Sequence, residues 1–204
     1  MHMIDLRNVT YQGPPLDDEE ILGLLPLSYS SLLRQVNGFI LLGGVLHVRG
    51  ACHAPSWHSI RNTFWGDLAL HKLYAVIAES DIPFGQDCVG DQFVLRKEIV
   101  HRLAAETGTI EDLKMTLDNF MMAAWENPDE LLTPEPLYKL KRQGTILQPG
   151  QLIHAFPPFC IKTQSSKISL RPISSDDLIS SHASLAQQLA NVPEGQKIRF
   201  VVDS

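Results

Sequence analysis

Asp87 and Asp91 lie four residues apart beside Gly85 and Gly90, and their side chains are the leading catalytic candidates in the chain. Two carboxylates at this spacing could divide general acid and general base roles or hold a divalent cation. A cation site with oxygen ligands needs more carboxylates than Asp81, Asp87 and Asp91 provide, and acids beside glycines commonly bond the backbone of turns. We therefore predict a structural role for the pair and no catalytic residue.

Four residues between positions 47 and 58 carry side chains that zinc accepts: His47, Cys52, His53 and His58. Their spacing matches no zinc finger, and no second group of Cys or His residues supplies a matched pair of ligands. Phosphate-binding loops and dinucleotide-binding glycine motifs are also missing from the sequence. We predict no metal site and no cofactor.

Cys88 could act as a nucleophile, with one of the eight histidines as its base. Residue types without positions in space do not identify a catalytic triad, and a small apolar core thiol is the more common role for a cysteine. We expect no enzyme. A small hydrolase that uses Asp87, Asp91 or Cys88 remains an alternative.

The segment that carries the two aspartates is expected to be a loop leading into a strand. Gly85 and Gly90 permit turn conformations, and residues 92–96 then alternate between polar and apolar side chains. The alternation of period two predicts two faces for this strand. Phe93 and Leu95 are assigned to the buried face, and Gln92 and Val94 to the other.

Two helices are predicted near the N-terminus. Acids at positions 17–20 precede an apolar group, which favours a short helix because acids stabilise helix N-termini. Pro26 marks the boundary of a second helix with Ser28 as its cap, and the pair Asn37-Gly38 ends it. The buried stripe of this second helix is formed by Tyr29, Leu32, Leu33 and Val36.

The remaining elements are mostly strands that arrive in hairpin-sized groups. Gly43-Gly44 is a hairpin signal between strands at 39–42 and 45–48. Helical turns are expected at 59–65, residues 74–78 are compatible with helix or strand, and residues 131–159 form an ordered connector. Further strands are predicted at 99–103, 109–113, 167–173 and 197–202, with helices at 117–125, capped by Thr116, and at 178–189, capped at residues 174–177. This order predicts an α+β fold with a central, mainly antiparallel sheet and flanking helices, in one domain spanning residues 1–204.

Composition narrows the class of partner. The net charge of -6 and the pI near 5.7 argue against a nucleic-acid partner, because nucleic-acid-binding proteins concentrate Lys and Arg on one face. They favour a cationic protein as the partner instead. Three widely spaced cysteines and the absence of a recognisable secretory signal indicate a cytoplasmic protein with reduced thiols. The most apolar run, residues 39–48, is about half the ~20 residues of a membrane-spanning helix, so no membrane association is expected.

Several short motifs occur in order: Leu25-Pro26-Leu27-Ser28-Tyr29, Val36-Asn37-Gly38-Phe39, Ile82-Pro83-Phe84-Gly85-Gln86-Asp87 and Gly90-Asp91-Gln92-Phe93-Val94-Leu95. Together they resemble the SUKH superfamily, which includes bacterial toxin-immunity proteins and fungal regulators of cell-wall assembly. The resemblance is sharp between residues 25 and 108 and loose in the extension 109–204. It implies that the fold-defining positions are Pro26, Tyr29, Asn37, Gly38, Pro83, Gly90, Asp91 and Phe93.

The resemblance implies a non-enzymatic cytoplasmic protein that binds another protein. In the immunity branch that partner would be a toxin, for example a nuclease, and an acidic inhibitor suits a cationic toxin domain. The alternative is a regulatory or scaffold protein in cell-wall or envelope assembly. We expect the partner to contact an exposed surface formed by Trp57, Asp81, Asp87 and Asp91.

Overall fold

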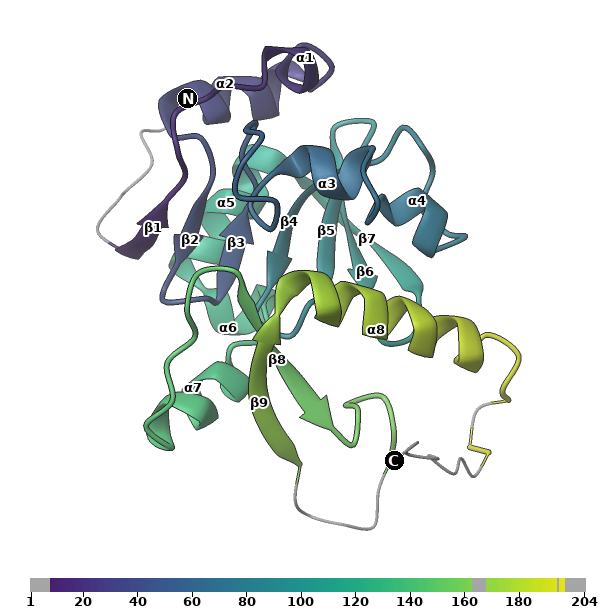
Figure 1. Cartoon of the computed structure of the whole chain (residues 1–204). Helices are drawn as coiled ribbons and strands as arrows, with labels where there is room; N and C mark the ends of the chain where they lie inside the picture. The colour runs from purple at the N-terminus through teal and green to yellow at the C-terminus, as the bar shows by residue number, and fades with distance from the viewer. Residues whose placement is uncertain (1–7, 163–167, 194, 197–204) are drawn as a thin grey trace.

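The computed structural model describes residues 8–162, 168–193 and 195–196, and its main feature is a seven-stranded sheet (Figure 1). The strands follow one another in sequence order, and each pairs with its neighbour in antiparallel fashion. They are β1 (Val9–Gln12), β2 (Phe39–Leu41), β3 (Leu46–Val48), β4 (Ile82–Asp87), β5 (Gln92–Arg96), β6 (Ile99–Ala104) and β7 (Thr109–Thr116). This meander confirms the predicted antiparallel sheet.

A second, two-stranded antiparallel sheet and eight helices complete the part of the chain that the structure describes. The small sheet consists of β8 (Gln151–Phe156) and β9 (Ser169–Ser174). The helices are α1 (Glu19–Leu22), α2 (Leu27–Gln35), α3 (Ile60–Phe64), α4 (Leu70–Leu73), α5 (Leu117–Glu126), α6 (Pro128–Leu131), α7 (Glu135–Arg142) and α8 (Ser175–Leu189). The α+β fold class is therefore confirmed.

Helices cover both faces of the central strands, with α5 behind the sheet and α8 in front of it in Figure 1. Phe120 of α5 packs edge-to-face against Phe84 at 5.4 Å and in a tilted arrangement against Phe93 at 4.7 Å, measured between ring centroids. On the opposite face, Val94 is buried in one cluster with Ile179 of α8. Phe93 and Val94 thus lie on opposite faces as predicted, but both are fully buried because α8 covers the second face.

The extension beyond residue 108 belongs to this core. β7 is the last strand of the main sheet, and the core that contains Phe93 also includes Phe120 of α5 and Ile153 of β8. Residues 109–162 and 168–193 are therefore structural parts of the fold around the motifs at 25–108.

The N-terminal elements follow the predicted pattern. α1 begins after Asp18, whose carboxylate accepts a hydrogen bond from the Ile21 amide at 3.1 Å, and α2 buries Tyr29, Leu32 and Leu33. Gly38 adopts the left-handed conformation with φ at +74°. β2 and β3 form the predicted hairpin, although residues 42–45 make its loop longer than Gly43-Gly44 alone.

The prediction of a loop at residues 82–87 is wrong. These residues form β4, a central strand buried along its whole length between β3 and β5. Gly85 suggested a turn, but β4 accommodates it within the ladder through a register irregularity between Pro83 and Gly85. Long-range pairing with β3 and β5 thus overrides the local turn signal.

Other boundaries also differ from expectation. Ser28 does not cap α2, because it lies inside the helix and its hydroxyl donates to Glu98 Oε2 at 2.7 Å. The connector at 131–159 contains α7 and β8, and residues 74–78 form turns. The predicted strand at 197–202 lies outside the described residues.

Two predicted helix caps are confirmed. Thr116 accepts a hydrogen bond from the Asn119 amide at the start of α5, and Ser174 accepts one from the Asp177 amide at the start of α8. Within the described ranges, no helix combines the length and the apolar character required to cross a bilayer.

Candidate functional site

Asp87 organises the turn between β4 and β5. Its Oδ1 accepts hydrogen bonds from the amides of Val89 and Asp91, each at 3.0 Å. Its Oδ2 is buried and has no hydrogen-bond partner among the described residues. Burial raises the pKa of Asp87 well above its ordinary value, and the charge of Asp91 raises it further. The side chain therefore holds the turn through its two accepted hydrogen bonds, and it stays protonated at pH values where an exposed aspartate is already ionised.

The other two predicted acids are also engaged inside the protein. Asp91 accepts a hydrogen bond from the Ala105 amide at 3.0 Å. Asp81 is 2% exposed, accepts from the Ala78 amide at 2.8 Å and pairs with Arg96 at 2.6 Å. The expectation of exposed acids is wrong for Asp81 and Asp87, which are buried, while Asp91 is half-buried. All three carboxylates form hydrogen bonds or ion pairs inside the protein.

Trp57 is half-buried and belongs to an aromatic cluster, so it is less exposed than expected. Its ring lies 5.2 Å from Tyr11, 5.3 Å from His47 and 5.4 Å from His58, measured between ring centroids. Gly150 lies against the same ring, where an added Cβ would approach it to 3.0 Å. Trp57 therefore links the N-terminal strands to the segment before β8.

Two of the three histidines considered for zinc, His47 and His58, form a hydrogen-bonded chain instead. His58 Nε2 is 2.9 Å from the Asn37 carbonyl, and His58 Nδ1 is 2.9 Å from His47 Nε2. A carbonyl only accepts, so His58 donates through Nε2 and accepts from His47 Nε2, which leaves His47 Nδ1 to accept from Gln86. Burial lowers the pKa of both histidines, in agreement with this neutral arrangement. The described residues contain no group of three metal-ligating side chains.

Arg49 lies at the other end of this polar chain and is 1% exposed. Its guanidinium donates to the carbonyls of Pro83 and Gly85, and to the side-chain oxygens of Gln86 and Gln92 at 2.7 Å each. Burial lowers the pKa of Arg49 to about 10, so the group keeps its charge at neutral pH. We did not anticipate this residue, for which the only sequence signal is a charge directly after an apolar strand.

Cys88 is buried, and its thiol donates to the Thr133 carbonyl at 3.1 Å. Burial raises the pKa of Cys88 well above its ordinary value, with a further contribution from the charge of Asp87. Nucleophilic cysteines need a lowered pKa and access to substrate. The site of Cys88 provides neither, and the thiol fits the predicted role of a core residue.

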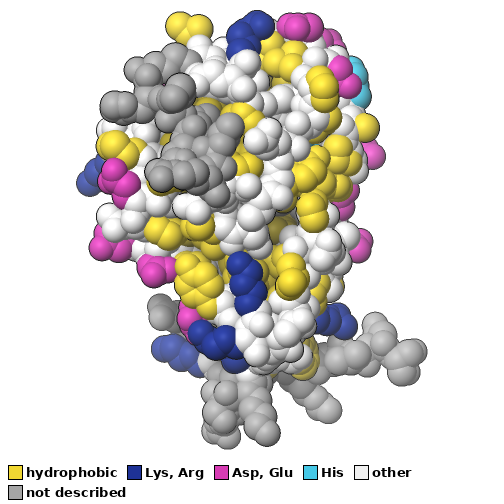
Figure 2. All heavy atoms as spheres, turned by 90° about the vertical axis from the view of Figure 1, so that its left-hand side faces the viewer, with side chains coloured by type: hydrophobic (Ala, Val, Ile, Leu, Met, Phe, Trp, Pro, Cys, Tyr) yellow, Lys and Arg dark blue, Asp and Glu magenta, His cyan; other side chains and the backbone are white. Residues whose placement is uncertain are grey.

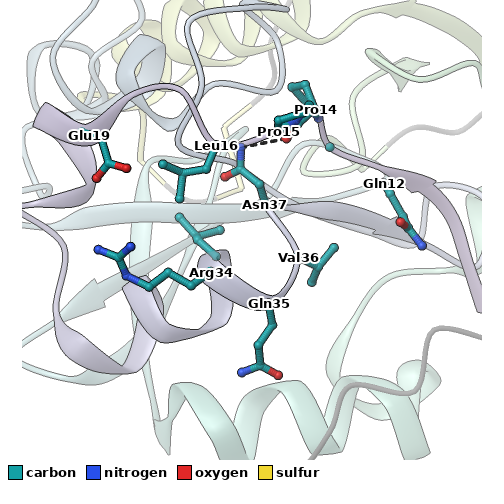
Figure 3. A pocket seen from close by; sticks show the side chains of 11 residues that line it. Gln12, Pro14, Pro15, Leu16, Glu19, Arg34, Gln35, Val36 and Asn37 are labelled. Atoms are coloured by element: carbon teal, nitrogen blue, oxygen red, sulfur yellow. Dashed lines mark hydrogen bonds between the residues drawn. The ribbon is translucent and has the colours of Figure 1, made fainter.

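An open groove of about 570 Å³ lies between residues 12–16 and α2 (Figure 3). Leu16, Leu33 and Val36 supply apolar surface, and the Asn37 side chain donates to the Pro14 carbonyl beside them at 3.0 Å. Figure 3 shows Glu19 and Arg34 at the same end of the groove, both to the left of Leu16. Pro14 and Pro15 have no backbone N–H, so this wall of the groove offers carbonyl acceptors and apolar rings.

Glu19 and Arg34 are both exposed, and neither forms an ion pair or a side-chain hydrogen bond within the described part of the chain. Two unpaired opposite charges beside an apolar floor can bind a surface that carries complementary charges. The groove is thus the candidate site that the structure offers in place of the predicted acidic loop.

No protein-family model matches the chain, and no curated protein matches it. Among solved structures, the crystal structure of Atu4351 from Agrobacterium tumefaciens is similar, with a TM-score of 0.56 over 87% of this chain and 86% of that chain. The two sequences are 14% identical, so the similarity concerns the fold alone. The SUKH resemblance stays a prediction.

Proposed function

We propose that this chain is a non-enzymatic cytoplasmic protein that binds a cationic protein domain, in the manner of an immunity protein that neutralises a toxin. The motifs that resemble the SUKH superfamily and occur in the same order along the chain support a protein-binding function. The groove beside α2 supports the mode of binding, because an open apolar floor with charges at one end suits a protein segment better than a small molecule.

The observation that carries the proposal is the pair of unpaired charges, Glu19 and Arg34, at one end of the groove. Glu19 is the first residue of α1, and Asp17, which precedes the helix, and Glu20, which pairs with Arg61 at 2.7 Å, are exposed as well. Together with the net charge of -6, these acids would attract a basic partner and accelerate the encounter. The partner's basic residue would contact Glu19. Arg34 would then favour a partner that also carries an acidic or carbonyl group next to that basic residue.

The test begins with purification of the tagged chain from its native host and identification of the protein that accompanies it. Binding of the purified pair is then measured at low and high salt, and association should slow as salt screens charges beyond a Debye length of ~8 Å at 0.15 M. Glu19→Lys and Arg34→Glu should each weaken binding roughly tenfold, equivalent to about 1.4 kcal/mol.

Matched controls reverse charges away from the groove: Glu79→Lys for Glu19→Lys, and Lys72→Glu for Arg34→Glu, since both control residues are exposed. Equal effects of the groove variants and the controls would show that the groove is not the contact surface. Absence of a protein partner, together with turnover of a small molecule that is lost in Asp87→Ala, would show that the chain is an enzyme.

A further inference from the structure

A second cavity, of about 480 Å³, lies on the β1–β3 side of the sheet, where the chain between α7 and β8 returns to it. Thr10, Tyr11 and Ile40 line it from the sheet, and residues 146–152 line it from the other side. It shares no lining residue with the groove beside α2. Its volume lies within the range of about 300 to 1,000 Å³ that is typical of small-molecule sites.

The walls of this cavity are largely apolar. Ile40 and Leu152 are buried strand residues that line it, and Leu147 packs within 3.1 Å of the position where a Cβ of Gly44 would be. Gly44 has φ at +119°, a conformation that side chains rarely adopt. These residues can contact the apolar body of a ligand.

The charge around the cavity is positive, although the whole chain is acidic. Among the residues that the structure describes, no Asp or Glu lines it, and Lys141 is its only charged lining residue. The Lys141 ammonium donates to the Leu42 carbonyl at 3.0 Å and forms no ion pair with a described carboxylate. Lys139, Lys141 and Arg142 end α7, and Figure 2 shows Lys and Arg side chains gathered at the lower end of the molecule, where α7 lies.

The inner end of the cavity adds to this positive field. His47 and Gln86 line it, and the Gln86 side-chain oxygen accepts from the buried guanidinium of Arg49 at 2.7 Å. Arg49 forms no salt bridge with a described carboxylate, although the charge of Asp176 acts on it from a distance. A buried cation without an ion pair favours a negative charge nearby.

Tyr11 supplies a neutral donor in the same cavity. Its hydroxyl forms no hydrogen bond within the described residues. Burial raises the pKa of Tyr11, so the hydroxyl keeps its proton at neutral pH. The ammonium of Lys141 and this hydroxyl are two donors that the cavity offers to an anionic group.

We propose that the cavity is a binding site for a small amphipathic carboxylate, with Lys141 and Tyr11 binding the carboxylate and Ile40, Leu147 and Leu152 contacting the apolar body. A hydrogen bond between charged groups is stronger than one between neutral groups, so the carboxylate should bind roughly tenfold or more tightly than an uncharged analogue. Recognition therefore depends on both parts of the ligand.

Octanoate is a suitable probe, with 1-octanol as its uncharged analogue and acetate as the carboxylate without an apolar body. Titrations of the isotope-labelled full chain are followed by amide NMR shifts at neutral pH. Octanoate should shift the amides of Gly44 and Leu152 and bind roughly tenfold tighter than octanol. Acetate should produce no saturable shift.

Lys141→Gln should weaken octanoate binding by about the same factor and leave octanol binding unchanged, whereas Lys139→Gln, on the same helix but outside the cavity, should change neither. Tyr11→Phe should weaken octanoate alone, by a smaller factor. Equal binding of octanoate and octanol, equal effects of the two lysine variants, or shifts confined to other parts of the chain would overturn the proposal. The groove variants Glu19→Lys and Arg34→Glu should leave octanoate binding intact, so this test does not depend on the protein partner.

Discussion

Asp87 carries a carboxyl group with one oxygen bonded to two amides and the other without a partner among the described residues. Because burial raises its pKa, the folded state prefers the protonated acid, and its contribution to stability is lost as pH rises from the unfolded pKa through the folded pKa. Asp87→Asn keeps the acceptor without the charge. We expect its free energy of unfolding, relative to the native chain, to rise as the pH increases above the ordinary pKa of an aspartate, because the native chain loses stability there. Asp87→Ala should cost about 1 to 3 kcal/mol because two amides lose their acceptor. Denaturant unfolding across this pH range measures both variants, and equal destabilisation by Asn and Ala would contradict a neutral Asp87.

β5 and α5 meet through Phe93, whose ring is fully buried against Phe84 and Phe120. Truncation of this ring leaves a cavity between a central strand and the helix behind the sheet. Phe93→Ala should therefore lower the free energy of unfolding by roughly 3 to 5 kcal/mol. Leu27→Ala is the control, because Leu27 is 80% exposed at the start of α2 and should change stability by less than about 0.5 kcal/mol. Equilibrium unfolding in urea compares the two, and a cost near that of the control would mean that α5 does not pack on β5.

The whole molecule holds His47, His58, His154 and His182 in surroundings that lower their pKa values, chiefly through burial. For His182, on α8, the pKa falls to about 4. The unfolded chain then binds more protons than the folded one between pH 6.5 and pH 4, so these histidines make stability fall as the pH is lowered through that window, by about 1.4 kcal/mol for each unit of pKa difference. His182→Gln should reduce this loss. His53→Gln, at a side chain that is 63% exposed, is the matched control. Thermal unfolding of His182→Gln and His53→Gln is compared between pH 4 and pH 7. Both variants retain Asp87, so its opposite contribution cancels in the difference between them. Equal pH profiles for the two variants would contradict the prediction for His182.

The sequence by itself determined α5 and α8 by their apolar stripes and caps, α2 by its stripe alone, and the β2–β3 hairpin by its glycines, because these signals lie within a few residues. It also determined the structural role of Asp87, since an acid beside glycines bonds the nearest amides. Only the tertiary structure decided that residues 82–87 form a central strand, because pairing with β3 and β5 overrides the turn signal of Gly85. The same pairing and the cover by α8 bury Asp81, Arg49 and both faces of β5. The groove and the cavity each join segments that lie apart in the sequence, so no local pattern could predict either one.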